Sequence, residues 1–301
     1  MRKKRNRQLW SPTVASTGWS ESTFAEQGWD QARRAAVRWS IAGALVGLLV
    51  AVVAFLPAAW LTRVVADATG ERLLLTDARG SIWSGSAVPV LAGGVGSRDA
   101  ASLPGRLEWT LLPTFTGLEV RVSQACCLNG TVRLLVKPGF GRTTVTLVPP
   151  TGPTPWMGQW PTAWLGGLGT PFNTLQLGGS VRIVSPAMTV EHVEGRWRLL
   201  GTVDLELIGV SSRLTTLDTL GSYKLTLSGG NGAPGAAGGA TLLSLSTQDG
   251  PLQLTGSGSW GPGGVRFRGE ARSAAIDEAA LANLLNIIGR RDGPRSIISI
   301  G

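Results

Sequence analysis

The sequence is poor in the side chains that most often perform chemistry. Its 301 residues include one histidine, His192, one tyrosine, Tyr223, and two cysteines. A Ser-His-Asp arrangement would have to use His192, which lies in the strand-like stretch TVEHVEG, and no nucleophile motif occurs elsewhere. One histidine and two adjacent cysteines give no zinc-ligand spacing. We therefore expect no enzyme activity, no catalytic or metal-binding residue and no cofactor, and we interpret His192 as structural.

Charged residues are also scarce, at 16 % of the chain, and the net charge of +9 is unevenly placed. Residues 1–40 hold eight Lys and Arg against three Asp and Glu, a net of +5, which leaves +4 (9 minus 5) for the rest. The run from Arg2 to Arg7 has the composition of a phosphate-binding segment. Because the remaining charge is thinly spread, we expect no nucleic-acid partner and assign this run to a membrane flank.

The segment from Ile41 to Leu61 is apolar and contains no charged residue. At ~1.5 Å per residue these 21 residues span roughly 31 Å, the thickness of a bilayer core. Trp39 and Trp60 bracket the segment as interfacial aromatics do, and the basic residues precede it, which favours a cytoplasmic N-terminus. We predict a disordered cytoplasmic tail at 1–38 and a membrane anchor at 39–61, surrounded by lipid. A cleaved signal peptide is the alternative, but the run is long for one and some 40 residues precede it.

Beyond the anchor, strict alternation of apolar and polar residues dominates, which is typical of half-buried strands. In RLEWTLL, Leu107, Trp109 and Leu111 face one way while Glu108 and Thr110 face the other. The same pattern occurs in LEVRVS, TVRLLV, TLQLGGSVRIV, TVDLELI, YKLTL, PLQLTG and VRFRG. We predict a mainly β protein, with an antiparallel, curved sheet in two halves on the far side of the membrane.

Several predicted strands open on glycine followed by serine or threonine. These openings are GSIW at Gly80, GTVRL at Gly130, GSVRI at Gly179, GTVDL at Gly201 and GSYKL at Gly221. Glycine permits a turn with positive φ or a close backbone approach. We interpret GSIWSGSA, residues 80–87, as the first such unit, with Trp83 in the core or on a sheet face; a ligand-binding loop is the alternative.

A segment crowded with proline, glycine and tryptophan separates the two predicted halves, residues 62–148 and 174–301. In this segment, 149–173, Trp156, Trp160 and Trp164 lie four apart, and Pro161 permits only short turns. We interpret it as a connector with its own small apolar cluster; contact of the tryptophans with a partner or a membrane is the alternative.

The chain closes with a helical pattern. In DEAALANLLNIIGRR, Leu281, Leu284, Leu285 and Ile288 fall on one face, and Gly289 marks the end of the helix. We expect this face to pack on the sheet and SIISI to add a short final strand.

Cys126 and Cys127 are adjacent. Their Cα atoms are ~3.8 Å apart across a trans peptide, whereas disulfides usually need at least ~4.4 Å. We expect two reduced thiols, with a vicinal or an intermolecular disulfide as alternatives in an oxidising compartment.

Taken together, the chain resembles the type II secretion system protein N (GspN) family. The resemblance covers roughly residues 39–301 and rests on the anchor ending FLPAAWL, on TDARGSIWSGSA, and on LDTLGSYKLTL, DGPLQLTGSGSW, VRFRGEARSA and DEAALANLLNIIGRRDG in that order. It implies a single-pass component of the cell inner membrane that faces the periplasm, supports export of folded proteins and contacts other type II secretion subunits. It names no site residues.

Two functions are compatible with this pattern. One is a structural component whose apolar faces fill a core; the other is a carrier of lipid or another apolar ligand, because short glycine-opened strands after an anchor also resemble the AsmA-type β-groove proteins. We favour the filled core, because closing helices such as Leu281–Ile288 usually bury a sheet face.

Overall fold

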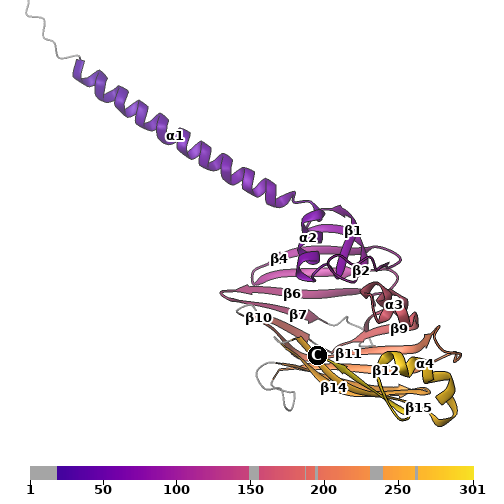
Figure 1. Ribbon diagram of the computed structural model, residues 1–301. Helices are drawn as coiled ribbons and strands as arrows, with labels where there is room; N and C mark the ends of the chain where they lie inside the picture. The colour runs from indigo at the N-terminus through magenta and orange to yellow at the C-terminus, as the bar shows by residue number, and fades with distance from the viewer. Residues whose placement is uncertain (1–18, 149–155, 187, 194–195, 231–239, 262–263) are drawn as a thin grey trace, which may run out of the picture. The chain divides into compact units, whose positions relative to one another are not determined.

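The computed structural model describes residues 19–148, 156–186, 188–193, 196–230, 240–261 and 264–301. The chain separates into two units, which meet in the sequence between Phe55 and Leu56. The first contains one long helix, and the second contains the sheet and the remaining helices (Figure 1).

The long helix, α1, runs from Trp19 to Ala54 and is longer than the sequence suggested. Its segment Ala36–Ala54 is long and apolar enough to cross a membrane. The predicted tail was therefore wrong from Trp19 onward, while residues 1–18 lie outside the described part. Pro57 interrupts the helix before the predicted end of the anchor at Leu61, and the chain then starts a separate helix, α2 (Ala58–Ala68).

The described residues of the second unit form one antiparallel sheet of 17 strands, and the alternation predicted such a sheet. Its first strands are β1 (Leu73–Gly80), β2 (Ser84–Ala92), β3 (Ala100–Ser102), β4 (Leu107–Thr114), β5 (Gly117–Ser123), β6 (Thr131–Gly139), β7 (Arg142–Val148) and β8 (Trp156–Pro161). A 3-10 helix, η1 (Thr162–Leu168), and a short helix, α3 (Phe172–Leu175), follow. The later strands are β9 (Leu177–Val184), β10 (Met188–Val193), β11 (Arg196–Ser212), β12 (Gly221–Gly229), β13 (Thr241–Asp249), β14 (Leu252–Gly261), β15 (Gly264–Ser273), β16 (Arg290–Asp292) and β17 (Arg295–Ile300). Between β15 and β16 lie η3 (Ala275–Asp277) and α4 (Glu278–Ile288).

The sheet forks at β11, its longest strand. The first part of β11 pairs with β10, which continues through β7, β6, β5 and β4 to β2 and β1. The second part of β11 pairs with β9, which continues only to β8. On its other side β11 pairs with β12, and the sheet runs on through β13, β14 and β15 to β17 and β16.

This fork corrects the prediction of a connector at 149–173. Residues 149–155 lie outside the described part, but Trp156–Pro161 form strand β8 inside the sheet. The strand ends at Pro161 and η1 begins at the next residue, so the proline separates two short elements as expected. Trp160 and Trp164 stack with ring centroids 6.4 Å apart, which agrees with the predicted local apolar cluster.

The two faces of the sheet differ in chemistry. Since residues directly opposite each other in antiparallel strands share a face, the pairing places Trp109, Leu147 and Tyr223 on one face, which we call the inner face. The outer face carries ion pairs, among them Lys224–Asp204 at 2.8 Å, Arg142–Glu191 and Arg121–Glu119. The hydrogen bond from Arg121 lowers the pKa of Glu119. The alternation seen in the sequence therefore separates an apolar face from a charged one.

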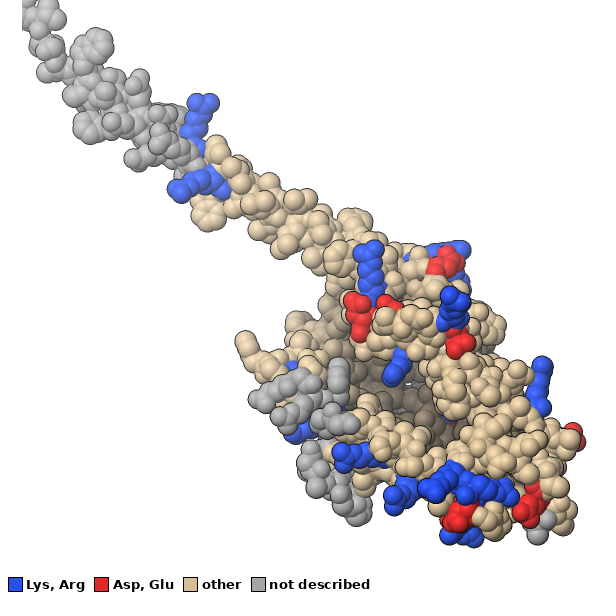
Figure 2. All heavy atoms as spheres, viewed as in Figure 1, with Lys and Arg blue, Asp and Glu red and all other residues tan. Residues whose placement is uncertain are grey.

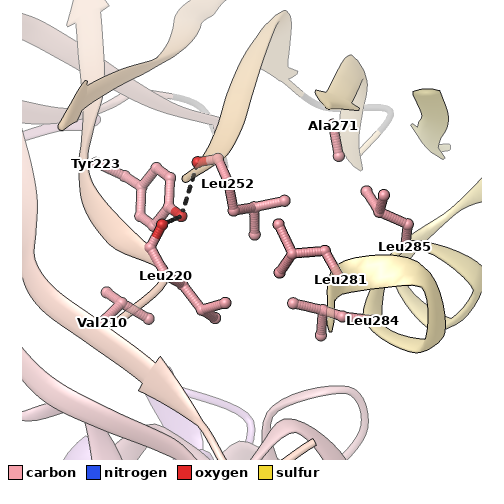
Figure 3. Close-up of a cluster of buried hydrophobic side chains, with 8 residues drawn as sticks. All are labelled: Val210, Leu220, Tyr223, Leu252, Ala271, Leu281, Leu284 and Leu285. Carbon is pink, nitrogen blue, oxygen red and sulfur yellow. Dashed lines mark hydrogen bonds between the residues drawn. The ribbon is translucent and has the colours of Figure 1, made fainter. Parts of the chain in front are cut away.

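The largest core cluster lies under α4, at one end of the inner face (Figure 3). It consists of Val210, Leu220, Tyr223, Leu252, Ala271, Leu281, Leu284 and Leu285. The three leucines of α4 point toward the sheet, as their spacing predicted. Gly289 ends the helix in an extended conformation, and a Cβ there would lie 2.4 Å from the carbonyl oxygen of Ile297. Close packing on β17 therefore requires this glycine.

Tyr223 anchors the same cluster through its hydroxyl. The hydroxyl is 3.0 Å from the carbonyl oxygens of both Leu220 and Leu252, and the side chain is 1 % exposed. Burial raises the pKa of the Tyr223 phenol, so the group stays protonated. The only tyrosine of the chain therefore ties the carbonyl of Leu220, which precedes β12, to the first carbonyl of β14 inside an apolar core.

The stretch GSIWSGSA forms a hairpin turn and then the first residues of β2, so the predicted order of turn and strand is confirmed. Gly80, at φ +87°, ends β1, and β2 begins only at Ser84. Trp83 lies in the turn and is half-buried, so its placement in the core was wrong. The buried tryptophan is Trp109, which is 4 % exposed and lies against Gly85, where a Cβ would come 2.6 Å from Cζ2 of the ring. The second glycine of the stretch thus makes room for an aromatic ring from another strand.

The five Gly-Ser and Gly-Thr pairs have the predicted backbone conformation, but not all of them lie at the start of a strand. Positive φ occurs at Gly80, Gly130, Gly179, Gly201 and Gly221. Gly179 and Gly201 nevertheless lie inside strands β9 and β11 and do not open them. The Gly-Ser/Thr pattern therefore marks unusual backbone conformation more reliably than it marks the ends of strands.

Cys126 and Cys127 form a disulfide, so the expectation of two reduced thiols was wrong. Their Cα atoms are 3.7 Å apart, as expected for neighbouring residues joined by a trans peptide, and the two sulfurs bond within the turn after β5 despite this short spacing. The same turn binds the edge strand β8: the Gln159 amide donates to the Cys127 carbonyl, and the Asn129 amide donates to the Met157 carbonyl, each at 2.8 Å. The disulfide therefore lies in a loop that fixes β8.

Candidate apolar binding surface

The inner face is not filled by one continuous core. Three clusters of buried residues lie on it: the α4 cluster, a small cluster of Ala58, Ala87 and Trp109, and a small cluster of Val132, Leu147 and Met157. The second forms where α2 packs on β2 and β4, and the third forms where Met157 of β8 meets β6 and β7. The expectation of a filled core was therefore wrong for the surface between the clusters.

A set of aliphatic side chains on the inner face belongs to none of these clusters and is half-buried. We call it the apolar band; it consists of Leu118, Val120, Val136, Val145, Val190, Val203, Leu205, Leu225, Leu227 and Leu243. Its strands, β5, β6, β7, β10, β11, β12 and β13, are consecutive neighbours in the sheet. At about 4.8 Å between strands, the band extends about 29 Å across the sheet.

Side chains of opposite strands meet directly along this band. Val190 is opposite Val145 on one side and Leu199 on the other, and Leu205 is opposite Leu225. Figure 2 shows a hollow in the middle of the second unit, surrounded mainly by uncharged residues. The band is thus a continuous, half-buried aliphatic surface on the inner face of the sheet.

No site residue was predicted from the sequence, and the band explains why none was recognised. Each of its members appears in the sequence as one apolar residue of an alternating strand, which has the same appearance whether the face is covered or open. Which apolar residues remain half-exposed depends on where α2, α4 and β8 pack, and these contacts join residues far apart in the chain.

The scarce reactive side chains do not gather into a second site. His192 lies in β10 opposite Thr143 of β7 and Trp197 of β11. Within the described ranges, no group of three His, Cys, Asp or Glu residues is placed to hold a metal ion.

A separate cavity of about 600 Å³ lies beside α3 and the end of β11. Phe172, Leu177 and Leu217 line it together with Arg213 and Asp218. The polar residues Asn173, Gln176, Ser211 and Ser212 also line this cavity, which shares no residue with the clusters of the sheet's inner face except Leu177 and Leu217 at the edge of the α4 cluster.

The helix and the sheet define a class of protein: one described helix that is long and apolar enough to cross a membrane, followed by one large open antiparallel sheet. The family model for type II secretion system protein N matches residues 71–298, and the chain belongs to this family. A search of curated proteins and a search of solved structures each found no match. The family match spans β1 to β17 and confirms the resemblance found in the sequence.

Proposed function

We propose that this protein is an accessory, structural component of the inner membrane in the type II secretion pathway. The family match over residues 71–298 is the observation that carries the proposal. The helical segment Ala36–Ala54 supports anchoring in the inner membrane. The protein would contact other type II secretion subunits, and lipids would surround the anchor.

The proposed orientation places the N-terminus in the cytoplasm and the sheet in the periplasm. Arg33, Arg34 and Arg38 precede the apolar segment, and positive flanks stay on the cytoplasmic side. The expected result is that alkaline phosphatase fused after Gly301 is active, whereas a fusion after Arg38 is inactive. Enzyme activity of each fusion in intact cells, normalised to its amount, gives the measurement. The opposite pattern, active at Arg38 and inactive at Gly301, would reject this orientation.

The proposed role predicts a secretion defect when the protein is missing. Deletion of its gene should lower the amount of type II substrates in the medium and raise their amount in the periplasm. Immunoblots of medium and periplasm measure both, with a resident periplasmic protein as the control for leakage. Restoring the full-length chain should restore export. Unchanged export in the deletion strain would contradict the accessory role.

A further inference from the structure

We propose that the apolar band binds an acyl chain of a membrane phospholipid. This inference goes beyond the proposed secretion role and does not depend on it. It follows from three properties of the band: its chemistry, its extent and its place in the chain.

The chemistry of the band favours a ligand without polar groups along its length. The members of the band are all aliphatic, and the neighbouring ion pairs of β11 and β12, such as Lys224–Asp204, lie on the opposite face. A peptide laid across the band would keep its backbone N–H and C=O groups without partners, because the sheet's own backbone groups are paired in its ladders. An acyl chain has no such groups, and each methylene that leaves water contributes favourably.

The extent of the band suits the same ligand. The hydrocarbon core of a bilayer is about 30 Å thick, so the acyl chains of one leaflet extend about 15 Å. The band extends about 29 Å across seven adjacent strands, at the usual strand spacing. An extended acyl chain can therefore remain in contact with aliphatic side chains along its full length.

The covalent structure keeps the sheet close to a source of lipid. Only Phe55, Leu56 and Pro57 separate the apolar segment that ends at Ala54 from α2, whose Ala58 is buried on the inner face. Those few residues reach about 14 Å at most. Membrane phospholipid is thus the apolar molecule that this protein meets at the highest local concentration.

The test uses the full-length protein in nanodiscs of phosphatidylethanolamine and phosphatidylglycerol that contain a phospholipid with a diazirine in its acyl chain. After illumination, mass spectrometry of peptides locates the crosslinks. We expect labelling of peptides from β11 to β13 in addition to the segment Ala36–Ala54, which is an internal control for bilayer contact. Labelling confined to α1 and α2 would overturn the inference.

A matched pair of variants on β13 makes the test specific. Leu243 belongs to the band, whereas Ser244, the next residue, is exposed on the outer face. Leu243→Glu should lower labelling of the band about tenfold or more, because a carboxylate resists transfer out of water, while Ser244→Glu should leave it unchanged. Equal labelling in both variants, with the α1 signal and the far-UV circular dichroism intact, would refute acyl binding at the band. If the deletion strain lost export but the band of the full-length protein was not labelled, acyl binding at the band would be refuted and the secretion role would stand.

Discussion

Replacing Trp109 by alanine is expected to lower the free energy of unfolding by about 3–5 kcal/mol, the usual range for a large aromatic side chain removed from a core. Trp109 is 4 % exposed and packs with Ala58 and Ala87, so the substitution leaves a cavity where α2 meets the sheet. It also removes the hydrogen bond from Nε1 to the Ile82 carbonyl at 3.1 Å. Urea unfolding of the full-length protein in a mild nonionic detergent, followed by the β signal in circular dichroism, gives the measurement.

Trp83 provides the matched control for Trp109. Both tryptophans belong to the same hairpin region, since the Leu111 amide donates to the Trp83 carbonyl at 2.7 Å, a contact that does not depend on the Trp83 side chain. Trp83→Ala should therefore lower stability by less than Trp109→Ala, because a half-buried ring leaves less of its surface in the core. If Trp83→Ala lowered the free energy of unfolding more than Trp109→Ala, the turn between β1 and β2, and not the Trp109 ring of β4, would stabilise this end of the sheet.

The pair of tryptophans illustrates how far the sequence could be interpreted. Local alternation was enough to place Trp109 on an apolar strand face in RLEWTLL, and the structure confirms that face. It was not enough to predict that the Trp109 ring is more buried than the Trp83 ring. That difference in burial depends on Gly85, a residue on another strand that lies directly opposite Trp109. Burial of one ring is set by pairing between strands, which short-range periodicity does not specify.

The fork of the sheet could not be predicted for the same reason: it depends on pairing between strands, which short-range periodicity does not specify. The stretch TVEHVEG, which contains most of β10, was recognised as strand-like, but β7 was not among the predicted strands, and the segment 149–173 suggested a break between two halves. In the structure β10 pairs with β7, and β9 pairs with a different part of β11, so the intervening chain returns to the sheet as β8. The proline and glycine content of this segment predicted its turns and concealed its strand, since β8 has only six residues and ends in proline.

The open inner face was likewise beyond the reach of sequence patterns. A closing helix was predicted correctly, and its burial of one sheet region was correct too. The sequence-based expectation was that α4 and the packed side chains cover the whole inner face, whereas α4 covers only one region of it. Since α4 has 11 residues and rises about 1.5 Å per residue, it is about 16 Å long, whereas the apolar band alone crosses seven strands.

Replacing Leu285 by alanine should also have a large effect, a loss of about 2–5 kcal/mol in the free energy of unfolding. Leu285 is 0 % exposed and lies with Leu281 and Leu284 against Leu252 and Ala271 of the sheet (Figure 3). Its removal leaves a cavity that α4 cannot close by moving, because Gly289 fixes the end of the helix against Ile297. The same detergent-based urea unfolding measures the loss.

Ile287, two residues further along α4, is the matched control because it is 49 % exposed and faces away from the cluster. Ile287→Ala removes an aliphatic side chain of equal size from the same helix, and alanine is the better helix former, so we expect a change within about 0.5 kcal/mol. A difference between the two variants therefore reports packing of α4 on the sheet and not a change in helix propensity. If Leu285→Ala proved as mild as Ile287→Ala, α4 would not be the cover that stabilises this end of the inner face, and the boundary drawn between the α4 cluster and the apolar band would have to move.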